Sequence, residues 1–151
     1  MSRTQSAALV EPEADVFDGL LGYHLRRLSV LVMTDLTQAL SPLDLRPADA
    51  SVLFVIAANP GITQSEVGKT LGILRANMAP LIGALLKRGL LERQPVDGRS
   101  HALTLSGAGR GLCTRARRVT QEHERRLFAT LTANAKSRLI AQLRQLWDHS
   151  Q

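Results

Sequence analysis

Residues 91–105 read LERQPVDGRSHALTL, and this stretch decides the fold. The apolar residues on both sides of its Asp97-Gly98 pair alternate with a period of two, which predicts two short strands. Asp-Gly between such strands is a strong signal for a tight hairpin. Arg93, Arg99 and His101 flank the turn, so the hairpin has a basic tip. Most of the remaining chain has the three-to-four-residue period of helices. The role of the basic hairpin therefore has to be inferred from the helices around it.

Two short helices are expected just before the hairpin. The sequence TQSE at 63–66 is a capping box, in which Thr63 and Glu66 satisfy each other's backbone amides. It predicts a helix over 63–71, and a second is expected over 74–88, closed by Gly89. Such a pair suits a helix-turn-helix, although helical pairs are also common in ordinary bundles. The hairpin directly after the pair favours a winged helix-turn-helix over 47–105, with the hairpin as a two-stranded β wing.

Long helices are expected at both ends of a mainly α protein. Apolar residues recur at helical spacing over 17–40 and again between 107 and 149, where TANAK (132–136) interrupts the pattern. Pro47 suits the first position of a further helix over 47–58. The terminal helices carry more apolar surface than a small domain can cover, so we expect them to meet another chain. Residues 1–14 are expected to be a flexible tail, and 1–151 a single domain.

Charge is divided unevenly along the chain. Of 151 residues, 19 are Lys or Arg and 13 are Asp or Glu, and residues 75–151 hold 14 of the cations but five of the acids. A basic half favours a polyanionic partner, although a solvated surface would have the same composition. No signal peptide, membrane span or metal-ligand spacing is visible, so a cytoplasmic protein without cofactor or metal is expected. The single Cys113 is expected to be buried packing rather than a redox switch.

Three motifs together resemble the MarR family of bacterial transcription regulators. They are LLKRGLLERQP at 85–95, the D-x-R-S wing at 97–100, and L-S-x-x-G at 105–109, where Ser106 stands in the usual place of Thr. The resemblance implies a homodimer whose terminal helices form the interface. It also implies that the helix over 74–88 enters the major groove of double-stranded DNA at a pseudo-palindromic operator. A small ligand usually releases the DNA in this family, and NMAPL at 77–81 resembles members that govern aromatic-acid breakdown.

The second helix of the pair holds the candidates for contact with bases. Arg75 can recognise guanine and Asn77 adenine, while Ala76 and Ala79 can contact thymine methyl groups. Asn77 could also be a plain helix-start residue. Pro80 departs from the family pattern and could shift the start of this helix.

Contacts with the DNA backbone are expected on both sides of that helix. Thr63, Gln64 and Ser65 lie at a helix start, which suits a phosphate, although capping alone would explain Thr63. Lys87 is a candidate phosphate contact or a plain solubility charge, as is Lys69. By resemblance, Arg99 of the wing contacts DNA, while Asp97 and Gly98 shape the wing; turn chemistry alone would also explain that pair.

The resemblance implies an effector site between the helices over 17–40, 47–58 and 107–127, near the dimer interface. Polar residues at plausible places are His24, Arg27, Ser29 and Arg46, and the expected ligand is an aromatic acid or its CoA thioester. Arg27 could equally be a surface charge. The arginines of 115–126 are expected to form a solvated helix face.

The sequence therefore predicts a homodimeric, sequence-specific repressor released by a small molecule. The alternatives are a winged-helix module for protein interaction and a nonspecific architectural DNA binder. We do not expect an enzyme, because no paired carboxylates, phosphate loop or nucleophile motif is visible.

Overall fold

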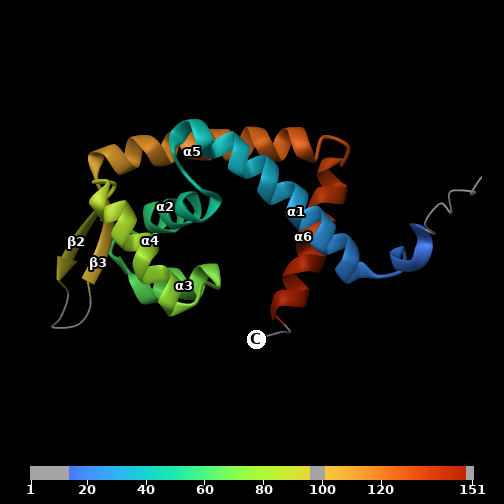
Figure 1. Cartoon of the computed structure of the whole chain (residues 1–151), viewed down its shortest axis with the longest axis horizontal. Helices are drawn as coiled ribbons and strands as arrows, with labels where there is room; N and C mark the ends of the chain where they lie inside the picture. The colour runs from blue at the N-terminus through green and yellow to red at the C-terminus, as the bar shows by residue number, and fades with distance from the viewer. Residues whose placement is uncertain (1–13, 96–100, 149–151) are drawn as a thin grey trace, which may run out of the picture.

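The chain folds mainly into helices, and the computed structural model describes residues 14–95 and 101–148. Figure 1 shows the arrangement, in which α2, α3, α4 and the strands form one body, α5 runs along the top of the view from this body toward α6, and α1 lies beside α5. The predicted tail lies outside the described residues apart from Ala14. In chain order the elements are η1 (Ala14–Phe17), α1 (Leu21–Leu40), η2 (Ser41–Leu43), α2 (Pro47–Ala58), β1 (Ile62–Thr63), α3 (Gln64–Leu71), α4 (Arg75–Lys87), β2 (Leu91–Pro95), β3 (His101–Leu105), α5 (Gly107–Leu127) and α6 (Ala133–Asp148).

The winged helix-turn-helix is confirmed, but its sheet has one strand more than expected. The strand order is β1-β3-β2, and both pairs are antiparallel. Arg93 lies opposite Leu103, and Ile62 lies opposite the same residue on the other side of β3. The predicted two-stranded wing is present as β2 and β3. The sequence did not predict β1, because this strand has two residues and is too short to show an alternating pattern.

Helix ends follow the capping signals, with one exception. Thr63 and Ser106 cap α3 and α5, and Gly72 and Gly89 take positive φ angles of 65° and 69° where α3 and α4 end. The expected start of the first helix at Phe17 was wrong. There the chain makes a 3₁₀ turn instead, and α1 begins at Leu21. Glycines at 19 and 22 weaken the helix at this end, which the apolar period alone does not reveal.

The hydrophobic core lies between α2, α4, α5 and the sheet. It fixes α4 by one face only, through Met78, Ile82 and Leu85, and leaves the other face of that helix in solvent. The largest side chains that are almost fully buried are Leu40, Val52, Leu53, Ile56, Val67, Met78, Ile82, Leu85 and Leu103.

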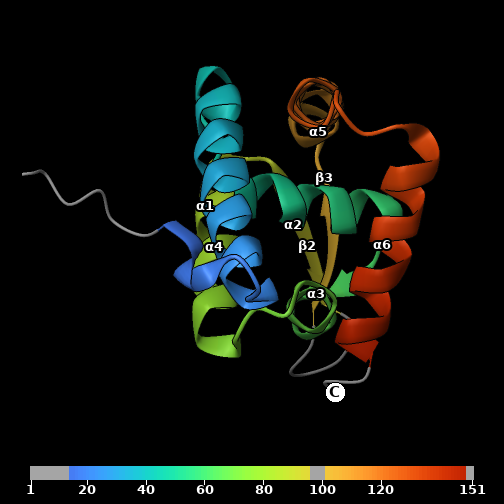
Figure 2. The same ribbon diagram turned by 90° about the vertical axis from the view of Figure 1, so that its right-hand side faces the viewer.

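The terminal helices are only partly covered by their own chain. α1 packs along α5, where Asp35 pairs with Arg126 and lies 3.2 Å from Nε2 of the buried His123. Figure 2 shows α1 and α6 on opposite sides of the molecule. No residue of α6 is buried. In the part of the chain that the structure describes, no helix combines the length and apolar character needed to cross a membrane.

Candidate nucleic-acid interface

The first component of the candidate site is the start of α3. Thr63 Oγ1 accepts a hydrogen bond from the backbone N of Glu66 at 3.4 Å and donates to Glu66 Oε2 at 2.7 Å. The same carboxylate oxygen accepts from the Thr63 backbone N at 2.8 Å. These bonds hold the pKa of Glu66 below its usual range, because they favour the charged carboxylate. The predicted capping box is therefore present, and the Thr63 hydroxyl proton is already used within it.

The second component is the exposed face of α4. This helix begins at Arg75 and continues through Pro80 to Lys87, so the proline does not displace its start. All the predicted base-contacting residues are exposed, and Lys87 is exposed at the far end of the same helix. The helix has no side-chain cap, because its N-cap residue is Leu74. The predicted base-contacting residues and the proline are Arg75, Ala76, Asn77, Ala79 and Pro80.

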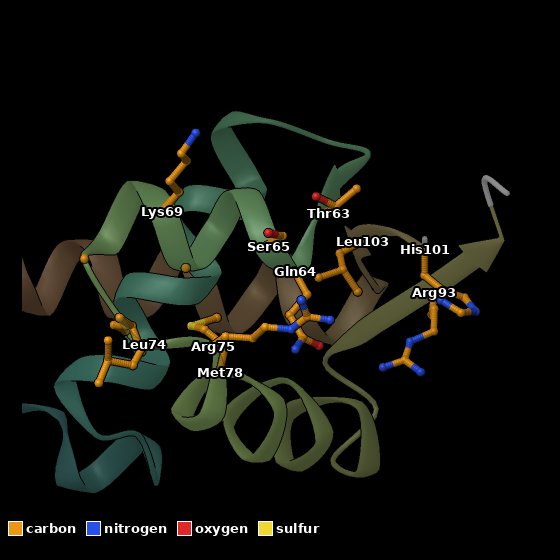
Figure 3. A pocket seen from close by; sticks show the side chains of 13 residues that line it. Thr63, Gln64, Ser65, Lys69, Leu74, Arg75, Met78, Arg93, His101 and Leu103 are labelled. Carbon is orange, nitrogen blue, oxygen red and sulfur yellow. The ribbon is translucent and has the colours of Figure 1, made fainter. Parts of the chain in front are cut away.

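Between these helices and the sheet runs a groove of about 860 Å³, which we call the α3–α4 groove. Lys69, Arg75, Arg93 and His101 supply basic side chains to it, and its described lining residues include no Asp or Glu. Figure 3 shows Arg75 extending from α4 toward Gln64, while Arg93 and His101 come from the strands. The groove is therefore electropositive and lies beside the amino end of an exposed helix, a combination that suits an anionic ligand.

The structure brings together only part of the predicted site. Thr63, Gln64, Ser65 and Arg75 line the groove, whereas Lys87 lies at the opposite end of α4. The predicted wing residues Asp97, Gly98 and Arg99 lie outside the described residues.

The lining residues that were not among the sequence-predicted contacts include Leu74, Arg93 and His101. The alternation of residues along the strand indicates on which face of β2 Arg93 lies. It lies two residues beyond the buried Leu91, so the two share one face of β2. Leu74 gave no such signal, because an apolar residue at a helix start is usually assigned to the core.

Three of the four predicted effector residues lie on α1, and the fourth lies at the start of α2. His24, Arg27 and Ser29 are exposed on α1, where Arg27 Nη1 donates to the Tyr23 hydroxyl at 3.3 Å. Arg46 precedes α2, and its Nε and Nη2 donate to Asp49 at 3.1 and 3.2 Å. This pairing raises the pKa of the Arg46 guanidinium above its usual value, because the hydrogen bond and the opposite charge favour the cation.

A second cavity lies on the other side of the sheet. We call this space of about 740 Å³ the α2–α5 cavity. Arg110, Arg117 and Arg118 line it, so part of the predicted solvated face of α5 borders a cavity. The remaining walls combine apolar and polar side chains, and Cys113, which is buried as expected, contributes to the apolar part. The other lining residues are Ile56, Ala57, Pro60, Glu92, Thr104, Leu105, Thr114 and Gln121. Among the described residues, no group of His, Cys, Asp or Glu could hold a metal ion.

Known proteins share this arrangement. The model of the MarR family matches residues 43–100. The HTH-type transcriptional repressor Rv2887 of Mycobacterium tuberculosis is 30% identical over 118 residues, which cover 77% of this chain and 85% of the relative. The chain belongs to the MarR family of transcriptional regulators.

Solved structures with the same fold include complexes with DNA and with small molecules. The transcriptional repressor CouR bound to a 23-mer DNA duplex has a TM-score of 0.84 and 38% identity, covering 90% of this chain and 98% of its own. CouR bound to p-coumaroyl-CoA has a TM-score of 0.81 and 36% identity, covering 90% and 97%. Rv2887 in complex with salicylic acid has a TM-score of 0.67 and 29% identity, covering 83% and 95%.

Proposed function

We propose that this MarR-family protein is a homodimeric repressor that binds a pseudo-palindromic operator and releases it when a small anionic aromatic compound binds. The observation that carries the proposal is the electropositive α3–α4 groove, which lies at the amino end of a helix exposed along one whole face. The DNA complex of CouR, which is 38% identical, supports the same use of the fold.

The exposed face of α4 supports direct contact with base edges. Arg75 would recognise guanine and Asn77 adenine, and the small Ala76 and Ala79 would let the helix backbone approach closely, with room for thymine methyl groups. Pro80 adds no donor on this face, so we assign it backbone proximity rather than recognition.

Backbone contacts would fix the register of the protein on the duplex. Gln64 and Ser65, beside the capped start of α3, would contact a phosphate, and Lys87 and Arg99 would contact others. Thr63 would act there through its backbone and its capping role, since its hydroxyl proton is bound to Glu66. Asp97 and Gly98 would shape the wing.

Dimerisation is supported by the terminal helices. α6 has 16 residues and buries none of them, although most of the stability of a helix in a protein comes from packing of its apolar face. α1 also exposes a wide apolar surface, so a second copy of the chain would cover both. The exposed large apolar residues of α1 and α6 are Leu21, Leu25, Leu28, Val30, Leu31, Met33, Leu139, Ile140, Leu146 and Trp147.

The α2–α5 cavity supports the effector site. Its apolar side chains suit an aromatic ring, and Arg110, Arg117 and Arg118 suit a carboxylate or the phosphates of a CoA thioester. The p-coumaroyl-CoA complex of CouR and the salicylic acid complex of Rv2887 support these two ligand classes. The prediction that His24, Arg27, Ser29 and Arg46 contact the effector stays a prediction, since these residues lie outside this cavity.

DNA binding is tested by fluorescence anisotropy on the promoter fragment upstream of the protein's own coding sequence, with a random duplex as comparison. We expect two half-sites with centres about 10 base pairs apart and an affinity that falls steeply with salt. Arg75→Ala should relax the preference at one base pair of each half-site, whereas Arg99→Ala should weaken all duplexes alike. Equal affinity for promoter and random DNA would favour the architectural binder, and no salt-dependent binding would favour the protein-interaction module.

Effector binding is tested with p-coumaroyl-CoA and salicylate added to the DNA complex. Either compound should release the wild-type protein, and Arg117→Ala should raise the concentration needed by about tenfold or more, since it removes one charge-assisted pair. Arg115→Ala is the matched control, because Arg115 lies on the same helix outside the cavity. An equal response of both variants would place the effector elsewhere.

A further inference from the structure

Leu74 is an apolar side chain placed where the fold offers it no partner. It is the N-cap residue of α4, yet 74% of its surface is exposed, the largest value among the exposed large apolar residues of the described chain. An N-cap is usually Ser, Thr, Asp or Asn, whose side chain accepts a hydrogen bond from the helix amides. Leucine gives up this bond and stays in water, so neither capping nor packing within the chain explains it.

The position of Leu74 also separates it from the surface that we assign to dimerisation. The other exposed large apolar residues of the described chain belong to residues 16–33 or 131–147, and Leu74 alone belongs to the helix-turn-helix. It lines the α3–α4 groove together with Lys69 and Arg75. Figure 3 shows the side chains of Leu74 and Arg75 diverging at the start of α4. The surroundings of Leu74 are therefore basic, which favours contact with a polyanion over contact with an apolar protein surface.

The base edges of DNA offer one methyl group that such a side chain can contact. In the major groove, the thymine 5-methyl group is the apolar feature of the base edges, and apolar side chains recognise it by contact. Recognition helices read bases with their amino-terminal residues, and Leu74 precedes the first residue of α4. A leucine there reaches further from the helix than the alanines at 76 and 79.

We propose that Leu74 is a specificity-determining residue that packs on the 5-methyl group of one thymine in each half-site. This inference rests on the proposed function, since it needs α4 to enter the major groove. It assigns to Leu74 a preference for thymine that differs in kind from the hydrogen-bonded recognition by Arg75 and Asn77.

The test replaces thymines of the bound promoter fragment by deoxyuridine, one at a time, which removes only the methyl group. The wild-type protein should lose affinity by about fourfold at one thymine of each half-site, the contribution of one buried methyl-sized group. Leu74→Ser restores a capping side chain and so preserves the helix. It should bind the thymine and deoxyuridine duplexes equally at that position and keep its sensitivity elsewhere. Leu74→Ala is a second variant with the same expectation.

Lys69→Ala is the matched control, because it lines the same groove but removes a charge. It should weaken every duplex alike and leave the difference between thymine and deoxyuridine intact. Suppose that the wild-type protein binds the promoter specifically, but that no loss of affinity at a deoxyuridine disappears in both Leu74 variants. This result would overturn the inference and leave the proposed function standing. Absence of any sequence preference in the wild-type protein would overturn the proposed function as well.

Discussion

At the scale of single residues, Gly109 fixes how the wing joins α5. A Cβ atom at this position would lie 1.9 Å from the carbonyl oxygen of Leu90, which also accepts a hydrogen bond from the backbone N of Ser106. Because the obstacle is backbone, it cannot move aside as a side chain would. Gly109→Ala should lower the free energy of unfolding by about 1–3 kcal/mol, the usual cost of overpacking. Denaturant unfolding followed by circular dichroism measures this.

Gly111→Ala provides the internal control for that prediction. Gly111 lies in the same helix, and a Cβ atom there would have no heavy atom within 4 Å. Alanine is a better helix former than glycine by about 1 kcal/mol, so this variant should be more stable than the wild type. If both variants shift stability in the same direction, the close approach at Gly109 does not govern the effect.

Thr63 links the stability of α3 to pH. Thr63→Ala should lower the free energy of unfolding by about 0.5–2 kcal/mol at neutral pH, as the loss of an N-cap usually does. The Thr63 bonds lower the pKa of Glu66 from its ordinary value of 4.5, so their contribution is present above that value. It is lost as the pH falls through the lowered pKa of the folded state. The difference in free energy of unfolding between variant and wild type should be smaller at acid pH than at pH 7. A difference that does not change with pH would contradict the linkage.

At the scale of elements, α4 contains a proline where a helix normally needs a donor. Pro80 is the sixth residue of α4, so no amide there can bond to the carbonyl of Ala76. Pro80→Ala should raise the free energy of unfolding by up to about 3 kcal/mol. Gly83→Ala lies at an exposed site of the same helix, where a Cβ atom would have open space. It should raise the free energy of unfolding by about 1 kcal/mol through helix propensity alone. A smaller gain for Pro80→Ala than for Gly83→Ala would show that the proline is compatible with this helix.

Elements with strong local signals could be predicted from the sequence. Thr63, Ser106, Gly72 and Gly89 mark helix ends by chemistry that acts within a few residues, and these ends agree with the structure. Where the deciding interaction is distant, prediction failed. β1 exists because Ile62–Thr63 pairs with β3 some 40 positions later, and two residues show no period.

At the scale of the whole molecule, the α2–α5 cavity shows what sequence patterns miss. Its walls come from α2, two strands and α5, which meet only in the folded chain. Arg110, Arg117 and Arg118 have the spacing of one helix face, so their clustering was visible in the sequence. That pattern does not distinguish a solvated face from a cavity wall, because the distinction depends on what lies opposite. The same limit applies to Leu74, whose exposure depends on α4 being fixed by its other face.

The terminal helices supply the prediction that belongs to the whole assembly. Leu31 of α1 and Trp147 of α6 are 53% and 65% exposed in the single chain. If they pack against a second copy, Leu31→Glu or Trp147→Glu would bury a charge at the interface and should dissociate the dimer. Light scattering should then give a mass of 16.5 kDa, that of one chain. Promoter affinity should fall with it, since each chain then reaches one half-site. Ala141→Glu, opposite the apolar face of α6, is the control and should leave both mass and affinity unchanged; a wild-type mass of one chain would refute the dimer.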